Sequence, residues 1–303
     1  MILQLIPEYR DYVWGGNHLR PGQRTAEAWV AFDGNRVAQG PWADKMLGEV
    51  VASLNPHHAA GFPLLIKLLD CADWLSVQVH PNDEQAIQLE GAGKRGKTEA
   101  WHVLDCAADA QLIAGIKPGI TPQALASDIQ NSKVMDDVQY LSVHPGDTVF
   151  MPAGTIHALG PGMQVYEVQQ ASDITYRVYD WGRPATANRP LHIAQSLAVV
   201  NANQCGQIIP AKEDSAQEVR HLVSCAYFDL DMLALENTPL VGNAPLGSMH
   251  TFTVIEGEAE LASGWERVAL AKNQTVCFIA DETSYRLTPR EKTRILRASV
   301  ATS

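Results

Sequence analysis

Hydrophobic and polar positions alternate in short runs along most of this chain. The runs are rich in β-branched and aromatic residues, and Gly, Pro, Asn and Asp separate them, which is the pattern of strands joined by tight turns. The runs expected to form strands are 75–80, 148–153, 163–169, 175–181, 226–235, 250–261 and 275–280. Many short strands of this kind predict a mainly β fold built from jelly-roll barrels.

Helices are expected to be few and short. Residues 81–90 begin with a helix-start signature, and residues 121–130 place Pro122 at the first helical position. The fold class predicted from the pattern is therefore β-barrels with small helical insertions.

Composition and charge limit the classes of partner. The chain has 303 residues, of which 46% are hydrophobic and 19% charged, as in ordinary globular proteins. Its net charge of −11 argues against binding to nucleic acid or to an anionic membrane. The chain start lacks the features of a secretion signal, and the five cysteines include no Cys-x-x-Cys pair. We therefore expect a cytoplasmic protein with reduced thiols.

The strongest chemical signal is the run GDTVFMPAGTIH at residues 146–157. It fits the second cupin motif, in which Gly146 opens a strand, Pro152 and Gly154 end it, and the following turn brings His157 to the mouth of a barrel. The asparagine that usually follows four residues later is replaced by Pro161. The motif predicts a cupin jelly roll with His157 as a metal ligand.

Upstream, Gln78 and His80 occupy the place of the usual cupin His-x-His. A spacing of two puts both side chains on one face of a strand, so that an amide oxygen and an imidazole can bind one ion. Two carboxylates could supply the third ligand: Glu84, four residues after His80, and Glu99, just before a strand-like run. Spacing alone does not choose between them.

A polar stretch at 203–222 separates two strand-rich blocks. We expect a catalytic, metal-binding cupin domain at 1–204 with small helical insertions, and a C-terminal cupin-like β domain at 205–303. The second barrel is expected to be degenerate and to lack a metal site, because His250 is the only histidine beyond the linker.

Several spaced segments resemble the short bacterial form of type I mannose-6-phosphate isomerase, also called phosphomannose isomerase. These segments are YRDYVWGG at 9–16, FPLLIKLLDCADWLSVQVHPND at 62–83, GKTEAWHVLD at 96–105 and QVYEVQQASDITYRVYDWGR at 164–183. The resemblance implies one zinc ion per chain, although Fe, Mn or Co would suit the same ligands. The zinc ligands that it implies are Gln78, His80, Glu99 and His157, which selects Glu99 as the carboxylate.

The same resemblance implies the activity, which is interconversion of mannose 6-phosphate and fructose 6-phosphate through an enediol. It places Lys97 and Arg177 in the active site, with Arg177 stabilising the enediol, and it assigns proton handling to Asp173 and Glu167. A phosphorylated hexose is thus the expected partner.

Phosphate would be bound by Ser76, which lies two residues before Gln78 on the same strand face, and by Arg183, whose guanidinium suits a phosphate. Two alternatives stay open. The protein could isomerise another phosphorylated sugar, or it could be a cupin that binds sugar or metal without catalysis.

Overall fold

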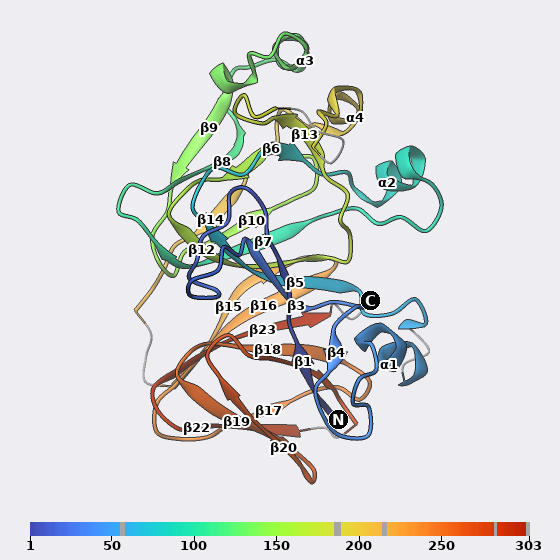
Figure 1. The fold of residues 1–303 in the computed structure, drawn as a ribbon, viewed down its shortest axis with the longest axis vertical. Coiled ribbons are helices and arrows are strands. Elements are labelled where there is room, and N and C mark those ends of the chain that lie inside the picture. Colours follow the sequence, from blue (N-terminus) through green and yellow to red (C-terminus); the bar gives the residue numbers. More distant parts are fainter. Residues whose placement is uncertain (55–57, 185–188, 214–216, 282–283, 301–303) are drawn as a thin grey trace. The chain divides into compact units, whose positions relative to one another are not determined.

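A computed structural model describes the chain apart from residues 55–57, 185–188, 214–216, 282–283 and 301–303 (Figure 1). The chain forms two compact units made of interleaved segments. Unit 1 consists of Met1–Tyr9, Ala28–Leu68 and Lys212–Ser303, and unit 2 consists of Arg10–Glu27 and Leu69–Ala211. The compact units thus do not coincide with a cut at residue 205. The assignment of catalysis to residues 1–204 and of a metal-free domain to 205–303 stays a prediction.

Unit 2 contains two groups of antiparallel strands. One group runs in the order β14 (Gln207–Ile209), β10 (Thr148–Met151), β7 (Glu99–Cys106) and β12 (Met163–Gln170). The other runs in the order β13 (Tyr176–Tyr179), β6 (Val77–Val79), β11 (His157–Leu159), β8 (Gln111–Ile116) and β9 (Val138–Ser142). The chain passes between the units within β2 (Glu8–Arg10), β3 (Glu27–Ala31) and β5 (Leu64–Cys71).

Alternation of side chains along the strands builds the core of unit 2. Trp101 on β7 and Val149 on β10 pack in one buried cluster with Leu112 on β8 and Leu159 on β11. Because the cluster takes side chains from both groups of strands, the two sheets face each other across it. The mainly β, jelly-roll class predicted from the sequence is confirmed.

Both predicted helices are present in unit 2. α2 (Asp83–Glu90) starts with a capping box between Asn82 and Gln85, and α3 (Pro122–Gln130) is capped by the hydroxyl of Thr121. α4 (Ile193–Val199) and the 3-10 turn η2 (Val134–Asp136) were not predicted. α3 and α4 pack against the outer face of the β13–β9 sheet (Figure 1). Across the described residues, no helix combines the length and apolar character needed to cross a membrane.

Unit 1 has its own pair of sheets, and its described residues include the helix α1 (Leu47–Leu54), which was not predicted. The first sheet runs β15 (Gln217–Ser224), β16 (Phe228–Leu235), β23 (Thr293–Val300), β18 (Met249–Glu256), β21 (Thr275–Ile279), β1 (Ile2–Ile6) and β4 (Arg36–Val37). The second runs β17 (Leu240–Asn243), β22 (Ser284–Pro289), β19 (Glu258–Ser263) and β20 (Glu266–Ala271). Phe252, Phe278 and Tyr285 form the aromatic centre of their shared core.

The predicted strand at 250–261 is two strands, because Gly257 breaks it between β18 and β19. Gly257 has φ +76°, and a Cβ there would lie 2.3 Å from the carbonyl oxygen of Lys292. Only glycine avoids both the backbone strain and that contact.

Candidate metal centre

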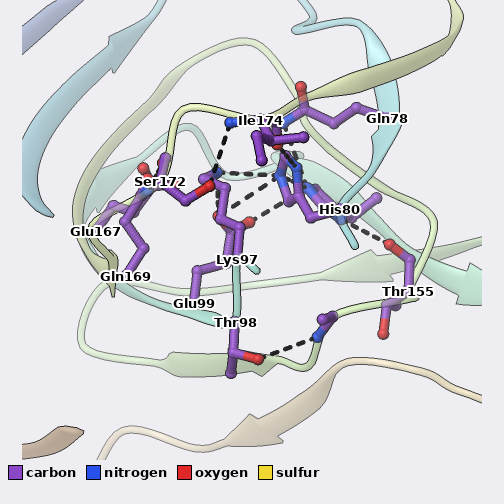
Figure 2. A network of polar contacts seen from close by, with 12 residues as sticks. Gln78, His80, Lys97, Thr98, Glu99, Thr155, Glu167, Gln169, Ser172 and Ile174 are labelled. Atoms are coloured by element: carbon purple, nitrogen blue, oxygen red, sulfur yellow. Dashed lines mark hydrogen bonds and ion pairs between the residues drawn. The ribbon is translucent and has the colours of Figure 1, made fainter. Parts of the chain in front are cut away.

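Three buried side chains of unit 2 bring metal-binding atoms together. His80 follows β6, Glu99 opens β7 and His157 opens β11. Nε2 of His157 lies 3.1 Å from Nε2 of His80 and 3.2 Å from Oε1 of Glu99, and Nε2 of His80 lies 3.8 Å from Oε2 of Glu99. Figure 2 shows His80 and Glu99 pointing toward the same point. The structure thus unites three of the four predicted ligands.

The glycine turn of the motif at 146–157 connects two of these ligands. Gly154 adopts φ +89°, which favours glycine, and its N–H donates to the carbonyl oxygen of His80 at 2.8 Å. The imidazole Nδ1 of His157 bonds the carbonyl oxygen of Thr155 at 2.8 Å. The turn therefore fixes the position of His157 relative to His80 and the orientation of the His157 ring.

Hydrogen bonding determines which ring nitrogens carry protons. A carbonyl oxygen can only accept a hydrogen bond, so a ring nitrogen bonded to one must carry a proton. Nδ1 is therefore protonated in His157, which bonds the carbonyl oxygen of Thr155, and in His80, which bonds that of Ile174 at 2.8 Å. Burial, and after it the positive charge of Lys97, lower the pKa of His157 to about 3, so its ring is neutral. Both Nε2 atoms then present lone pairs toward each other and toward a carboxylate, an arrangement that a cation stabilises.

The spacing of these atoms fits a small divalent metal. Zinc–nitrogen and zinc–oxygen bonds of about 2.1 Å in tetrahedral geometry place ligand atoms about 3.4 Å apart. The observed separations of 3.1, 3.2 and 3.8 Å bracket that value. The mixture of two imidazoles and one carboxylate is also a donor set that zinc and the neighbouring transition metals accept.

Gln78 lies beside this cluster. Its Cα pairs with that of His157 across β6 and β11, and its amide Nε2 is 3.3 Å from Nε2 of His157. An amide nitrogen has no lone pair to offer a metal, but a half-turn of the amide exchanges the nitrogen and oxygen. Gln78 is therefore placed to be the fourth ligand through its oxygen, and this role stays a prediction.

Glu84, the alternative carboxylate, takes no part in the cluster. It is exposed in the first turn of α2, where its Oε1 accepts from Gln88 at 3.5 Å. Glu99, by contrast, is fully buried. The carboxylate that lies in the cluster is therefore Glu99, the one that the family resemblance selected.

Lys97 brings a positive charge into the same cluster. Its ammonium is 3.0 Å from Nε2 of His80 and forms a close ion pair with the Glu99 carboxylate. Lys97 and Glu99 are both buried, with exposures of 4% and 0%. The Lys97 ammonium is thus in direct contact with two of the candidate ligands, His80 and Glu99.

A row of residues runs across three neighbouring strands at this site. The Cα register pairs Arg177 on β13 with Gln78 on β6, and Gln78 in turn with His157 on β11. Directly paired residues project from the same face of a sheet. Burial and the nearby Arg189 lower the pKa of Arg177, and its Nη1 donates to the carbonyl oxygen of Pro190 at 2.9 Å.

Trp101 is a site residue that the sequence reasoning missed. Its indole Nε1 donates to Oε2 of Glu167 at 2.8 Å, and its ring meets that of His157 edge-on, with centroids 5.4 Å apart. The Cα register pairs Trp101 with Glu167 across β7 and β12. The sequence did contain a signal for Trp101, because it lies two positions after Glu99 and therefore on the same face of the strand.

The other predicted site residues lie in different settings. Ser76 is buried just before β6, and Asp173 is exposed between β12 and β13. Arg183 donates to Asp180 at 3.0 Å and to Asp73 and the carbonyl oxygen of Trp74 at 2.6 and 2.8 Å. Much of its hydrogen-bonding capacity is used within the chain. The roles assigned to these residues stay predictions.

A jelly-roll unit with a buried His–Glu–His cluster beside strand ends is the architecture of a cupin with a candidate metal site. Residues 2–103 match the family model described as phosphomannose isomerase type I, catalytic domain. Mannose-6-phosphate isomerase ManA of Bacillus subtilis is 34% identical over 280 residues, covering 85% of this chain and 86% of that protein. The mannose-6-phosphate isomerase of Streptococcus mutans is 32% identical over 292 residues, covering 89% and 90%.

The likeness extends to three dimensions. The crystal structure of mannose 6-phosphate isomerase from Bacillus subtilis superposes with a TM-score of 0.84 at 28% identity, covering 98% of this chain and 99% of that one. The chain belongs to the type I mannose-6-phosphate isomerase family.

Proposed function

We propose that this protein is a metal-dependent aldose–ketose isomerase that interconverts mannose 6-phosphate and fructose 6-phosphate. The observation that carries the proposal is the buried cluster of His80, Glu99 and His157 with the ammonium of Lys97 against it. Family membership supports the choice of substrate. A phosphorylated hexose is the substrate class, and the cytoplasm is the proposed location.

The proposed metal is zinc, one ion per chain, held by His80, Glu99, His157 and the amide oxygen of Gln78. When bound, zinc supplies Lewis-acid polarisation of the substrate oxygens on C1 and C2. Fe, Mn or Co would accept the same nitrogen and oxygen donors.

The remaining steps belong to side chains of this chain. Moving a proton between C1 and C2 needs a group that removes it and returns it, for which Lys97, Glu167 and Asp173 are the candidates. Lys97 lies nearest to the cluster, and the indole of Trp101 orients the carboxylate of Glu167. Arg177 would stabilise the negative charge that develops on the enediolate oxygen.

Ser76 and Arg183 are the proposed phosphate ligands. Ser76 precedes β6, the strand that carries Gln78, and Arg183 follows β13, which pairs with β6. Both therefore lie near the ends of strands in the sheet from which Gln78 and Arg177 project. Asp180, Asp73 and the carbonyl oxygen of Trp74 already accept from Arg183, so phosphate binding by this residue would compete with those contacts.

A coupled assay for fructose 6-phosphate formed from mannose 6-phosphate tests the proposal. Zinc-loaded protein should turn over, and chelated protein should not. His157→Ala should lose both metal and activity, whereas His144→Ala, which removes an exposed histidine, should keep both. Zinc binding without turnover on this substrate would refute the proposal, and activity on other sugar phosphates or on none would then separate the two alternatives.

A further inference from the structure

The segment that carries Lys97 and leads into Glu99 is held by two side chains outside the cluster. Asp83 comes from the first turn of α2, and Gln170 ends β12. We name these two side chains, with the backbone N–H groups of Gly96 and Thr98 that they bind, the Asp83–Gln170 clamp. All four residues belong to unit 2.

The clamp binds the backbone on both sides of Lys97. The Asp83 carboxylate accepts from the N–H of Gly96 at 2.7 Å, and Gln170 Oε1 accepts from the N–H of Thr98 at 2.9 Å. The Gln170 Nε2 closes the arrangement by donating to the same Asp83 oxygen at 2.9 Å. Because the groups before and after Lys97 are both fixed, the direction in which its side chain leaves the backbone is fixed too.

Close packing makes the clamp specific. A Cβ on Gly96 would lie 2.5 Å from the carbonyl carbon of Asn82, so the start of α2 can approach only because this residue is glycine. The N–H of Lys97 also donates to the carbonyl oxygen of Pro81 at 2.9 Å, directly after His80. The same contacts therefore hold His80 and Lys97 against each other.

Gln170 is suited to this place because its amide is both donor and acceptor. It is 3% exposed and must satisfy an N–H on one side and a carboxylate on the other. A carboxylate could do only the first, and an apolar side chain could do neither. Its neighbour Gln169 points to the other face of β12, where its Cα pairs with that of Glu99.

We propose that Asp83 and Gln170 are positioning residues that set Lys97 and Glu99 in register with His80. The effect on metal binding stands on the cluster geometry, whereas the effect on turnover rests on the proposed isomerase function. Neither residue touches the candidate metal ligands' donor atoms, so both act through the 96–98 backbone.

The test variant is Gln170→Glu, which keeps the acceptor for Thr98 but sets a second carboxylate against Asp83. Zinc affinity, measured by competition with a fluorescent chelator, should fall about tenfold or more, as for other groups that orient metal ligands. The kcat should fall with it, while KM for mannose 6-phosphate changes little. Should this variant fail to fold, Gln170→Met removes both hydrogen bonds without adding charge and should show the same loss.

A rescue separates positioning from general destabilisation. Adding Asp83→Asn to Gln170→Glu restores one donor and one acceptor between the two side chains, and zinc affinity should return to within about threefold of wild type. The matched control is Gln85→Ala, which breaks the neighbouring capping box of α2 without touching the clamp. It should lower the melting temperature and leave zinc affinity unchanged.

Wild-type zinc affinity and kcat in a folded Gln170→Glu protein would overturn the inference. An equal loss of zinc affinity in Gln85→Ala would also overturn it, as would a double variant that binds zinc no more tightly than Gln170→Glu alone. Wild-type protein that binds zinc but does not isomerise would refute the proposed function alone, since the zinc measurements test the clamp without it.

Discussion

Replacing Lys97 by methionine should strengthen zinc binding while it weakens catalysis. The Lys97 ammonium lies 3.0 Å from Nε2 of His80 and pairs with the Glu99 carboxylate. A metal that binds the same two side chains must displace this ammonium or lie beside it. Methionine keeps the length of the side chain and removes the charge, so the competition disappears.

The size of the effect follows from the burial of the ion pair. Lys97 and Glu99 are 4% and 0% exposed, and removing one partner of such a pair leaves a buried charge that costs about 3–5 kcal/mol. Zinc at the Glu99 carboxylate would compensate that charge. If about 2 kcal/mol is recovered on binding, zinc affinity rises about 30-fold, since each 1.4 kcal/mol is a factor of ten.

Turnover should move in the opposite direction. Loss of a positioned proton-transfer group lowers rates by about 10²–10⁴-fold, so the zinc-loaded Lys97→Met protein should be nearly inactive. Zinc should also raise its melting temperature more than that of the wild type, because at a given free zinc concentration L a tighter ligand stabilises the folded state more, by RT ln(1 + L/Kd).

Chelator competition and thermal unfolding with and without zinc measure these quantities. Lys94→Met is the matched control, because it removes the same charge from an exposed position three residues earlier. It should leave both zinc affinity and turnover unchanged. Zinc affinity that is unchanged or weaker in Lys97→Met would show that the ammonium does not compete with the metal, and the reasoning would fail.

Three further predictions concern other contacts. Burial and the charge of Arg297 lower the pKa of His250 to about 4, so the unfolded state takes up a proton before the folded state as pH falls below about 6.5. The free energy of unfolding should therefore drop by about 3 kcal/mol between pH 6.5 and 4. In urea unfolding measured against pH, His250→Gln should lack this part of the pH dependence. Trp101→Phe removes the donor to Glu167 but keeps an aromatic side chain, and should lower kcat about tenfold in steady-state assays with zinc content unchanged. Gly257→Ala should cost more than about 1 kcal/mol of stability by chemical denaturation, because φ is +76°, without changing zinc affinity.

Patterns within single elements were readable from the chain alone. The period of two that puts Gln78 and His80 near one another, the glycine turn before His157 and the start signals of α2 and α3 all involve residues a few positions apart. Such patterns follow from local backbone geometry and side-chain direction, which the neighbouring residues determine. The jelly-roll class followed from the same local alternation, repeated along the chain.

Contacts between distant segments were decided only in three dimensions. Spacing left Glu84 and Glu99 equivalent, and the structure separates them because Glu84 faces outward on α2 while β7 carries Glu99 into the core. The register of β7 against β12 brings Trp101 to Glu167, and a shift of one residue would place them on opposite faces. Residues 1–9 and 28–68 likewise join a unit whose other strands lie beyond residue 211. Pairing and register depend on which surfaces can be buried together, and no local pattern contains that information.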